Sequence, residues 1–231
     1  MSLAKTLQVK SRGFRIENAY AAATPGASSE KEAIKATALI AKQIRDLQLR
    51  LYAEGQQGLL IVLQGMDAAG KDGTINHVLG MMNPQGCDVI GFKQPTPIEL
   101  RHDFLWRVHP YTPARGNVTI FNRSHYEDVL ITRVHQLCPK TQLNQRYAQI
   151  NQFEALLASQ ANTRIIKFFL HISREEQLAR FAARLDDPAK NWKISNSDLR
   201  RVWLRFLNNQ PRPGTSPRLG TLASSLRSAS S

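Results

Sequence analysis

The sequence has few cysteines and no long apolar run. Cys87 and Cys138 are its two cysteines, too few for a cysteine metal cluster and enough for one disulfide at most. We interpret them as reduced thiols of a cytoplasmic protein. No stretch approaches the roughly 18 apolar residues that span a bilayer. Residues 1–30 contain no apolar segment typical of a signal peptide, so we expect no membrane partner.

Acidic residues are scarce relative to basic ones. The chain has 31 Lys and Arg against 18 Asp and Glu, which gives a formal net charge of +13. Residues 201–231 contain five arginines and no acid, yet the preceding part of the chain is also basic. This charge favours a polyanionic partner: a nucleic acid, an acidic membrane surface or a polyphosphate. Charge alone does not distinguish these three.

Apolar runs alternate with helical patterns along most of the chain. Its length allows one α/β domain, or one with a small subdomain. The S-x-x-E box at Ser29 predicts a helix over residues 30–54, and the apolar run 59–63 predicts a buried strand. Further strands are expected at residues 88–92, 117–121 and 164–171, and further helices near residues 72–82, 97–108, 124–136 and 141–160. This order predicts a three-layer α/β fold with a parallel sheet.

The run GMDAAGKDGT, residues 65–74, follows the first predicted strand and precedes a helical pattern. It matches the phosphate-binding pattern G-x-x-x-x-G-K. Its glycines let backbone N–H groups turn toward phosphate oxygens, and its lysine adds a mobile positive charge. The alternative, a glycine-rich turn without a ligand, is disfavoured by the flanking strand and helix. The expected phosphate-binding residues are Gly65, Gly70, Lys71, Gly73 and Thr74.

The residue after the P-loop lysine differs from the usual pattern. Asp72 stands where Ser or Thr normally binds Mg²⁺ through its hydroxyl. Because carboxylates are good Mg²⁺ ligands, we expect Asp67 to bind the ion, with Asp72 and Thr74 as alternatives. Asn122 follows the strand 117–121 at the place of a Walker B residue, and is a second candidate ligand.

Three charged residues come shortly after Asn122. Arg123 is expected to hold phosphates, Glu127 to contribute to the binding site, and Asp128 to be the third candidate metal ligand. The alternative for Glu127 and Asp128 is that they are acids of a first helical turn, stabilised there by the helix dipole.

A second S-x-x-E box, Ser173 to Glu176, predicts a helix after the last strand. Arg180 and Arg184 are four residues apart and therefore share one face of it. Two arginines on one face suit a lid, around residues 173–200, that closes over transferring phosphates and neutralises their charge. The alternative is two solvated surface arginines.

Four motifs in this order resemble the polyphosphate kinase type 2 family. They are GMDAAGKDG (65–73), GFKQPTPIELRHDFLWR (91–107), IFNRSHYEDVL (120–130) and EEQLARFAARLDDPAKNWKIS (175–195). The resemblance covers roughly residues 10–200 and implies a P-loop kinase-like fold with a helical lid, in a homo-oligomer. It also implies Mg²⁺-dependent phosphoryl transfer between polyphosphate and nucleotides (AMP, ADP and ATP) without a covalent enzyme intermediate. FNRSHYED looks like the subgroup that phosphorylates both nucleoside mono- and diphosphates.

The resemblance also implies roles for individual residues. The catalytic set consists of the residues that would contact metal or transferring phosphates: Asp67, Lys71, Arg123, Arg180 and Arg184. Lys93 would contact the polyphosphate chain. Some relatives have Asp at the place of Asn122, and some have Asn at the place of Glu127, so the pattern is not matched at every position.

The resemblance ends near residue 200. Relatives continue with a Trp/Asp/Tyr-rich helix and regions of the form A-P-W-Y and I-P-x-x-R-K-W, whereas residues 201–231 form an atypical tail here. From about Asn208 the composition predicts no regular structure. With two nucleotides dropped, codons permitted for Pro217–Thr221 and Ala223–Ser230 can spell Ala-Pro-Trp-Tyr and Ile-Ile-Pro-Ser-Glu-Arg-Lys. We therefore predict a phosphotransferase domain over residues 1–200, and a frameshift is one hypothesis for the tail.

The leading functional hypothesis is a polyphosphate-dependent nucleotide phosphotransferase. An ATP-dependent nucleotide kinase with the same P-loop is the second, and a change of donor with AMP as acceptor distinguishes the two. A non-catalytic nucleic-acid-binding protein would use the basic surface. The sequence contains no RNP-like aromatic motif, zinc pattern or recognition-helix signature, so no nucleic-acid partner is expected.

Overall fold

A computed structural model describes residues 3–9, 14–16, 19–136 and 138–187. The chain divides into two compact units, Met1–Gln177 and Leu178–Ser231. The first unit contains the sheet and most of the predicted site. The predicted domain boundary near residue 200 and the predicted tail lie outside the described residues.

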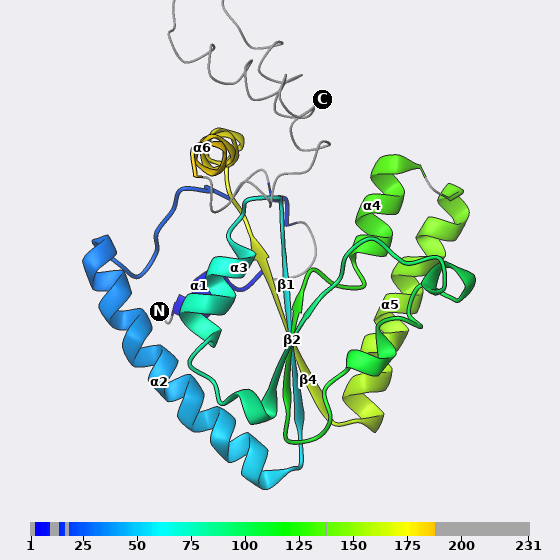
Figure 1. Cartoon of the computed structure of the whole chain (residues 1–231), viewed down its shortest axis with the longest axis horizontal. Coiled ribbons are helices and arrows are strands. Elements are labelled where there is room, and N and C mark those ends of the chain that lie inside the picture. The colour runs from blue at the N-terminus through cyan, green and yellow to red at the C-terminus, as the bar shows by residue number, and fades with distance from the viewer. Residues whose placement is uncertain (1–2, 10–13, 17–18, 137, 188–231) are drawn as a thin grey trace, which may run out of the picture. The chain divides into compact units, whose positions relative to one another are not determined.

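The first unit is built on a parallel sheet (Figure 1). Its strands are β1 (Gly58–Gly65), β2 (Cys87–Gly91), β3 (Val118–Asn122) and β4 (Thr163–Leu170), in the spatial order β2-β3-β1-β4. Every pairing is parallel, with Leu63 opposite both Asn122 and Phe168. The four strands confirm the predicted ones to within a residue or two at each end.

Helices cover both faces of the sheet, which confirms the three-layer α/β fold (Figure 1). On one side lie α2 (Glu30–Glu54), the short α3 (Lys71–Thr74) and a π-helical turn η2 (Ile75–Leu79); on the other lie α4 (Glu127–His135) and α5 (Lys140–Gln160). A short helix α1 (Leu3–Leu7) comes first, and a 3₁₀ turn η3 (Pro84–Gly86) precedes β2. Parallel neighbours require such crossover connections, because a tight turn cannot join them.

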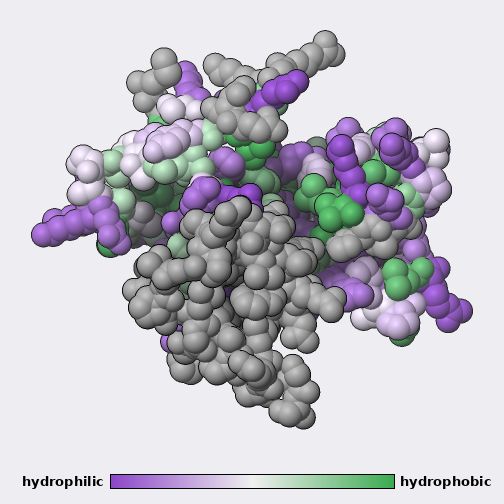
Figure 2. Space-filling view, turned by 90° about the horizontal axis from the view of Figure 1, so that it is seen from above, coloured by the Kyte–Doolittle hydropathy of each residue, from purple (hydrophilic) through white to green (hydrophobic). Residues whose placement is uncertain are grey.

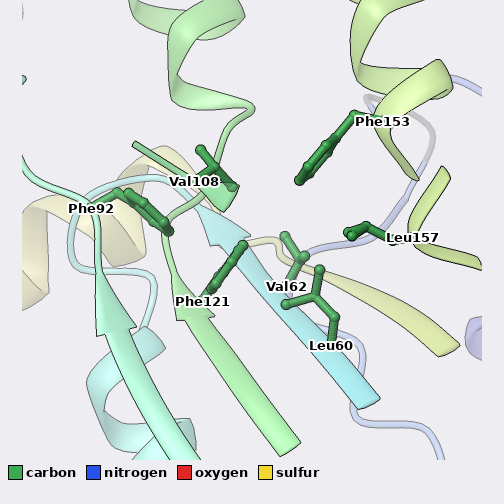
Figure 3. Close-up of a cluster of buried hydrophobic side chains, with 7 residues drawn as sticks. All are labelled: Leu60, Val62, Phe92, Val108, Phe121, Phe153 and Leu157. Atoms are coloured by element: carbon green, nitrogen blue, oxygen red, sulfur yellow. The ribbon is translucent and has the colours of Figure 1, made fainter. Parts of the chain in front are cut away.

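Two apolar clusters hold these layers together. Because successive strand side chains point to opposite faces, Leu60 and Val62 of β1 join one cluster while Ile61 and Leu63 join the other. The first cluster faces α5, and Figure 3 shows its members: Leu60, Val62, Phe92, Val108, Phe121, Phe153 and Leu157. The second packs against α2 and η2. As predicted, β1 is buried on both faces.

The prediction of a helix over residues 97–108 is wrong. The segment forms the 3₁₀ turns η4 (Glu99–Arg101) and η5 (His109–Tyr111), with further turns between them. The Asp103 carboxylate accepts hydrogen bonds from the backbone of Leu105 and Trp106, at 2.9 and 3.1 Å. Such local side-chain bonds compete with a helix for backbone donors.

The predicted helix starts are confirmed at Ser29 and Ser173. Ser29 Oγ accepts from the Glu32 N–H at 3.3 Å, and Ser173 Oγ accepts from the Glu176 N–H at 3.1 Å as α6 (Arg174–Leu185) begins. The Glu32 carboxylate bonds the backbone N–H of Ser28, one residue earlier than a capping box requires.

The visible surface mixes hydrophilic and hydrophobic residues (Figure 2). Leu130, Ile131 and Val134 of α4 are among the exposed apolar side chains. Within the described part of the chain, none of the helices combines the length and the apolar character that a membrane span requires.

Candidate functional site

The P-loop joins β1 to α3, and two of its glycines have conformations that disfavour a side chain. Gly65 and Gly70 have φ of +156° and +103°. A Cβ atom at Gly65 would lie 2.7 Å from the carbonyl oxygen of Leu170, whereas one at Gly73 would meet open space. The close approach of β1 and β4 therefore requires glycine at position 65, and no such steric reason applies at position 73.

The P-loop lysine lies against its own loop. Lys71 Nζ donates hydrogen bonds to the carbonyl oxygens of Gly65 and Met66, at 2.8 and 3.2 Å, and the residue is 9% exposed. Burial lowers the pKa of Lys71, and the nearby charge of Arg123 acts in the same direction. Thr74 Oγ1 donates to the Gly70 carbonyl at 3.1 Å, which fixes the start of the helix.

Arg123 connects the end of β3 to the P-loop. Its Nη2 lies 2.7 Å from Asp67 Oδ1 and its Nη1 lies 3.9 Å from Glu127 Oε2. The Arg123 backbone has φ of +66°, and its N–H donates to the Leu63 carbonyl at 3.1 Å. The predicted residues Asp67, Arg123 and Glu127, which are up to 60 positions apart, are thus brought together.

Asp72 faces the residue at the Walker B position. Asn122 Nδ2 donates a 2.8 Å hydrogen bond to Asp72 Oδ1. The sequence predicts Asp72 only as an alternative metal ligand to Asp67. The pairing of β1 with β3, which puts Leu63 opposite Asn122, brings the two residues into contact.

Glu127 and Asp128 have different surroundings although they are adjacent. Burial raises the pKa of both carboxyl groups. The charges that oppose this rise come first from Arg123 and Lys71 for Glu127, but first from Arg146 for Asp128. The charges that act most strongly on Glu127 are therefore those at the P-loop. The role of Asp128 as a metal ligand stays a prediction.

Two glutamines that the sequence analysis missed support the two loops of the site: Gln64 bonds the loop after β3, and Gln177 bonds the P-loop. Gln64 Nε2 donates to Ser124 Oγ at 2.8 Å, and both residues are buried. Gln177, in the first turns of α6, donates from Nε2 to the Asp67 backbone carbonyl at 2.8 Å. The sequence does carry a signal for Gln64, because it is a polar residue that follows the apolar run of β1 and directly precedes Gly65.

Lys93 lies two residues beyond the end of β2, and β2 pairs with β3 in the sheet. The Lys93 side chain is exposed, while its carbonyl accepts a 2.8 Å hydrogen bond from Arg107 Nη2. Arg107 is 9% exposed and also pairs with Glu99 at 3.6 Å. Lys93, Asn122 and the P-loop thus follow the carboxyl ends of adjacent strands, where ligands bind in open parallel sheets.

Arg180 and Arg184 lie on α6 within the second unit. Both are half-buried, and the Arg184 guanidinium lies 5.8 Å from the centre of the Phe181 ring. Their four-residue spacing on a helix is confirmed, and their role as lid arginines stays a prediction.

The carboxylate and amide oxygens near the P-loop are of the kind that could hold a cation together with a substrate. Among the described residues, no group of three or more His, Cys, Asp or Glu side chains forms a ready metal cluster. Mg²⁺ usually binds through one or two carboxylates together with substrate phosphates, rather than in an all-protein cage. Asp67 and Asp72, with the amide oxygen of Asn122, offer this chemistry beside the phosphate-binding loop.

The chain is also similar in sequence to known proteins. A family profile described as Polyphosphate kinase 2 (PPK2) matches residues 27–209. An AMP/ADP-polyphosphate phosphotransferase of Meiothermus ruber is 50% identical over 179 residues, which cover 77% of this chain and 67% of that protein. An ADP-polyphosphate phosphotransferase of Rhodopseudomonas palustris is 48% identical, over 72% of this chain and 62% of that protein.

A solved structure shows the same likeness in three dimensions. The crystal structure of Polyphosphate Kinase 2 from Arthrobacter aurescens TC1 matches with a TM-score of 0.82 and 45% identity, covering 88% of this chain and 73% of that one. The chain thus spans about two thirds of the length of the Meiothermus and Rhodopseudomonas relatives. It belongs to the polyphosphate kinase 2 family.

Proposed function

We propose that this chain transfers phosphoryl groups between inorganic polyphosphate and nucleotides. The observation that carries the proposal is the cluster of Lys71, Arg123 and Asp67 at the carboxyl ends of β1 and β3. Two positive side chains beside a P-loop fit a highly charged donor, and relatives at 48–50% identity are named polyphosphate phosphotransferases.

The proposed reaction is an in-line displacement. An oxygen of the acceptor nucleotide's terminal phosphate bonds to the terminal phosphorus of polyphosphate, and the bridging P–O bond breaks. The shortened polyphosphate leaves with the electron pair of that bond. Backbone N–H groups of the loop, Lys71 and Arg123 hold the phosphates in line and stabilise the negative charge on them. This needs no covalent enzyme intermediate.

Mg²⁺ is the proposed cofactor. Asp67, Asp72 and Asn122 would hold it, and Asp128 is a further candidate from the sequence. The ion would supply positive charge that neutralises the negative charge developing on the phosphates during transfer. The Asn122–Asp72 hydrogen bond supports this assignment, because it places an amide and a carboxylate side by side next to the loop.

Further properties belong to the same proposal. The acceptors are both AMP and ADP, which is supported by the name of the Meiothermus relative and by the run FNRSHYED at residues 121–128. We also propose a homo-oligomer that works in the cytoplasm, with Lys93 and the arginines of α6 contacting the polyphosphate chain.

Nucleotide formation from AMP, and separately from ADP, with long-chain polyphosphate and Mg²⁺ tests the proposal. We expect ADP and ATP as products, and we expect both to be lost in Lys71→Ala. Lys31→Ala is the matched control, since Lys31 is an exposed lysine of α2 far along the chain from the loop. Product formed with ATP as donor but not with polyphosphate would favour the ATP-dependent kinase instead.

The tail needs its own arm of the experiment. A version whose last 31 residues are replaced by the sequence of the alternative reading frame, which resembles the family, should be assayed beside this chain. If only the version with the replaced tail is active, the inactivity of this chain is due to its tail. If neither version forms product, polyphosphate is not the donor.

A further inference from the structure

Glu154 of α5 is the centre of a polar network that lies outside the P-loop cluster. Its Oε1 accepts a 2.7 Å hydrogen bond from the Tyr126 hydroxyl and lies 3.3 Å from His125 Nε2. Its Oε2 accepts a 2.7 Å hydrogen bond from Lys167 Nζ, which also donates to the Tyr126 hydroxyl at 3.0 Å. We call these four residues the Glu154 network; it joins α5, β4 and the loop after β3.

The network is set in a well-packed environment. His125 is fully buried, and its ring centre lies 6.3 Å from that of Phe121 and 5.5 Å from that of Phe153. Only 13% of the Glu154 side chain is exposed. Burial alone would raise the pKa of Glu154, but the hydrogen bonds from His125, Lys167 and Tyr126 lower it to about 2. Glu154 is therefore a carboxylate that these partners stabilise.

The loop that carries His125 and Tyr126 also carries Arg123. Arg123, the first residue of this loop, has a left-handed backbone conformation. This conformation is unfavourable for a residue with a side chain and persists only where the surroundings enforce it. On the β1 side, the Leu63 carbonyl accepts from the Arg123 N–H and Gln64 bonds Ser124. On the other side, the loop is fastened by the Glu154 network.

We propose that Glu154 is a positioning residue: by holding His125 and Tyr126, it fixes the loop that sets the Arg123 guanidinium against Asp67. Glu154 acts through Arg123 and does not itself contact substrate. The consequence for catalysis rests on the proposed function, whereas the fixing of the loop does not. Glu154→Gln tests this, because glutamine preserves the size of the side chain but removes the charge that Lys167 pairs with.

Amide hydrogen exchange tests the fixing of the loop directly. In Glu154→Gln we expect exchange at residues 123–126 to accelerate by about tenfold or more relative to the amides of β1. Glu54→Gln, the same change at an exposed glutamate of α2, should leave both segments unchanged. Unchanged exchange at the loop, or equal acceleration in the loop and β1, would overturn the proposal.

A double-mutant cycle tests whether Glu154 acts through Arg123. With polyphosphate and AMP, Glu154→Gln should lower kcat by about 10- to 100-fold with little change in the KM for AMP. In an Arg123→Ala background, the same change should lower the rate by less than about twofold. Equal losses in both backgrounds would mean an independent structural role and overturn the proposal. If the unmodified chain transfers nothing, the proposed function fails and hydrogen exchange alone decides the role of Glu154.

Discussion

The P-loop and the loop after β3 meet at one site, but different parts of the sequence determine their shapes. Over residues 65–74, the conformation is set mostly by local residues, namely glycines at positive φ and a lysine that bonds carbonyls of its own loop, while Gln177 adds one distant hydrogen bond to the Asp67 carbonyl. The loop over residues 123–126 depends on distant partners, namely Gln64, Glu154 and Lys167. A local motif can be read from sequence, whereas a loop held by distant partners becomes visible only in the fold.

The largest expected effect is at the lysine of the locally determined loop. Lys71→Met should lower kcat/KM by about 1,000-fold, or roughly 4 kcal/mol, because the positive charge that stabilises the transferring phosphates is lost. Folding stability should stay equal or rise, since burial lowers the pKa of Lys71 and its charge is therefore costly to hold. Steady-state kinetics and urea unfolding measure the two effects. A parallel loss of activity and stability would contradict a specifically catalytic role.

The next effect is on the loop that depends on distant partners. Since the pKa of Glu154 falls from an ordinary 4.5 to about 2, its ionised form stabilises the fold by about 3 kcal/mol at neutral pH. This stabilisation is present above pH 4.5 and is lost as the pH falls toward 2. Urea unfolding of the unmodified chain and Glu154→Gln should therefore differ by about that amount at pH 7 and converge in acid. A difference that does not depend on pH would contradict the assignment.

Glycine substitutions separate two positions within the P-loop. Gly65→Ala should destabilise the fold by about 2 kcal/mol, because its Cβ would meet the Leu170 carbonyl and the backbone φ is +156°. Gly73→Ala should be neutral or stabilise by about 0.5 kcal/mol, since its Cβ meets nothing and alanine favours the helix. Thermal unfolding compares them, and equal losses at both positions would contradict the described geometry.

A further effect, on activity alone, concerns the metal. Asn122→Asp would place a second carboxylate beside Asp72 and should lower the Mg²⁺ concentration for half-maximal activity by up to about tenfold, or roughly 1.4 kcal/mol. Asn76→Asp, a matched change at an exposed residue of η2, is the control. Mg²⁺ titration of the initial rate measures both variants. An unchanged Mg²⁺ requirement would exclude residue 122 as a ligand.

Much of this site follows from the sequence, and the failures have physical causes. The strands, the P-loop and the start of α6 are encoded locally by apolar runs, glycines and capping serines, and they were predicted. Asp72 and Asn122 are separated by 50 residues and the Tyr126–Glu154 bond spans 28, so parallel pairing had to be known before either contact could be inferred. The helix expected over residues 97–108 failed because Asp103 bonds its own backbone.

The most direct test of the central claim is the rate of ADP formation from AMP with polyphosphate as the only phosphoryl donor. The unmodified chain should form ADP with Mg²⁺ present, and both Lys71→Ala and Arg123→Ala should lower the rate by at least about 100-fold while remaining folded. That result would show that the P-loop and the loop after β3 act as one phosphate site. Undiminished rates in either variant, or product from ATP but not from polyphosphate, would contradict it.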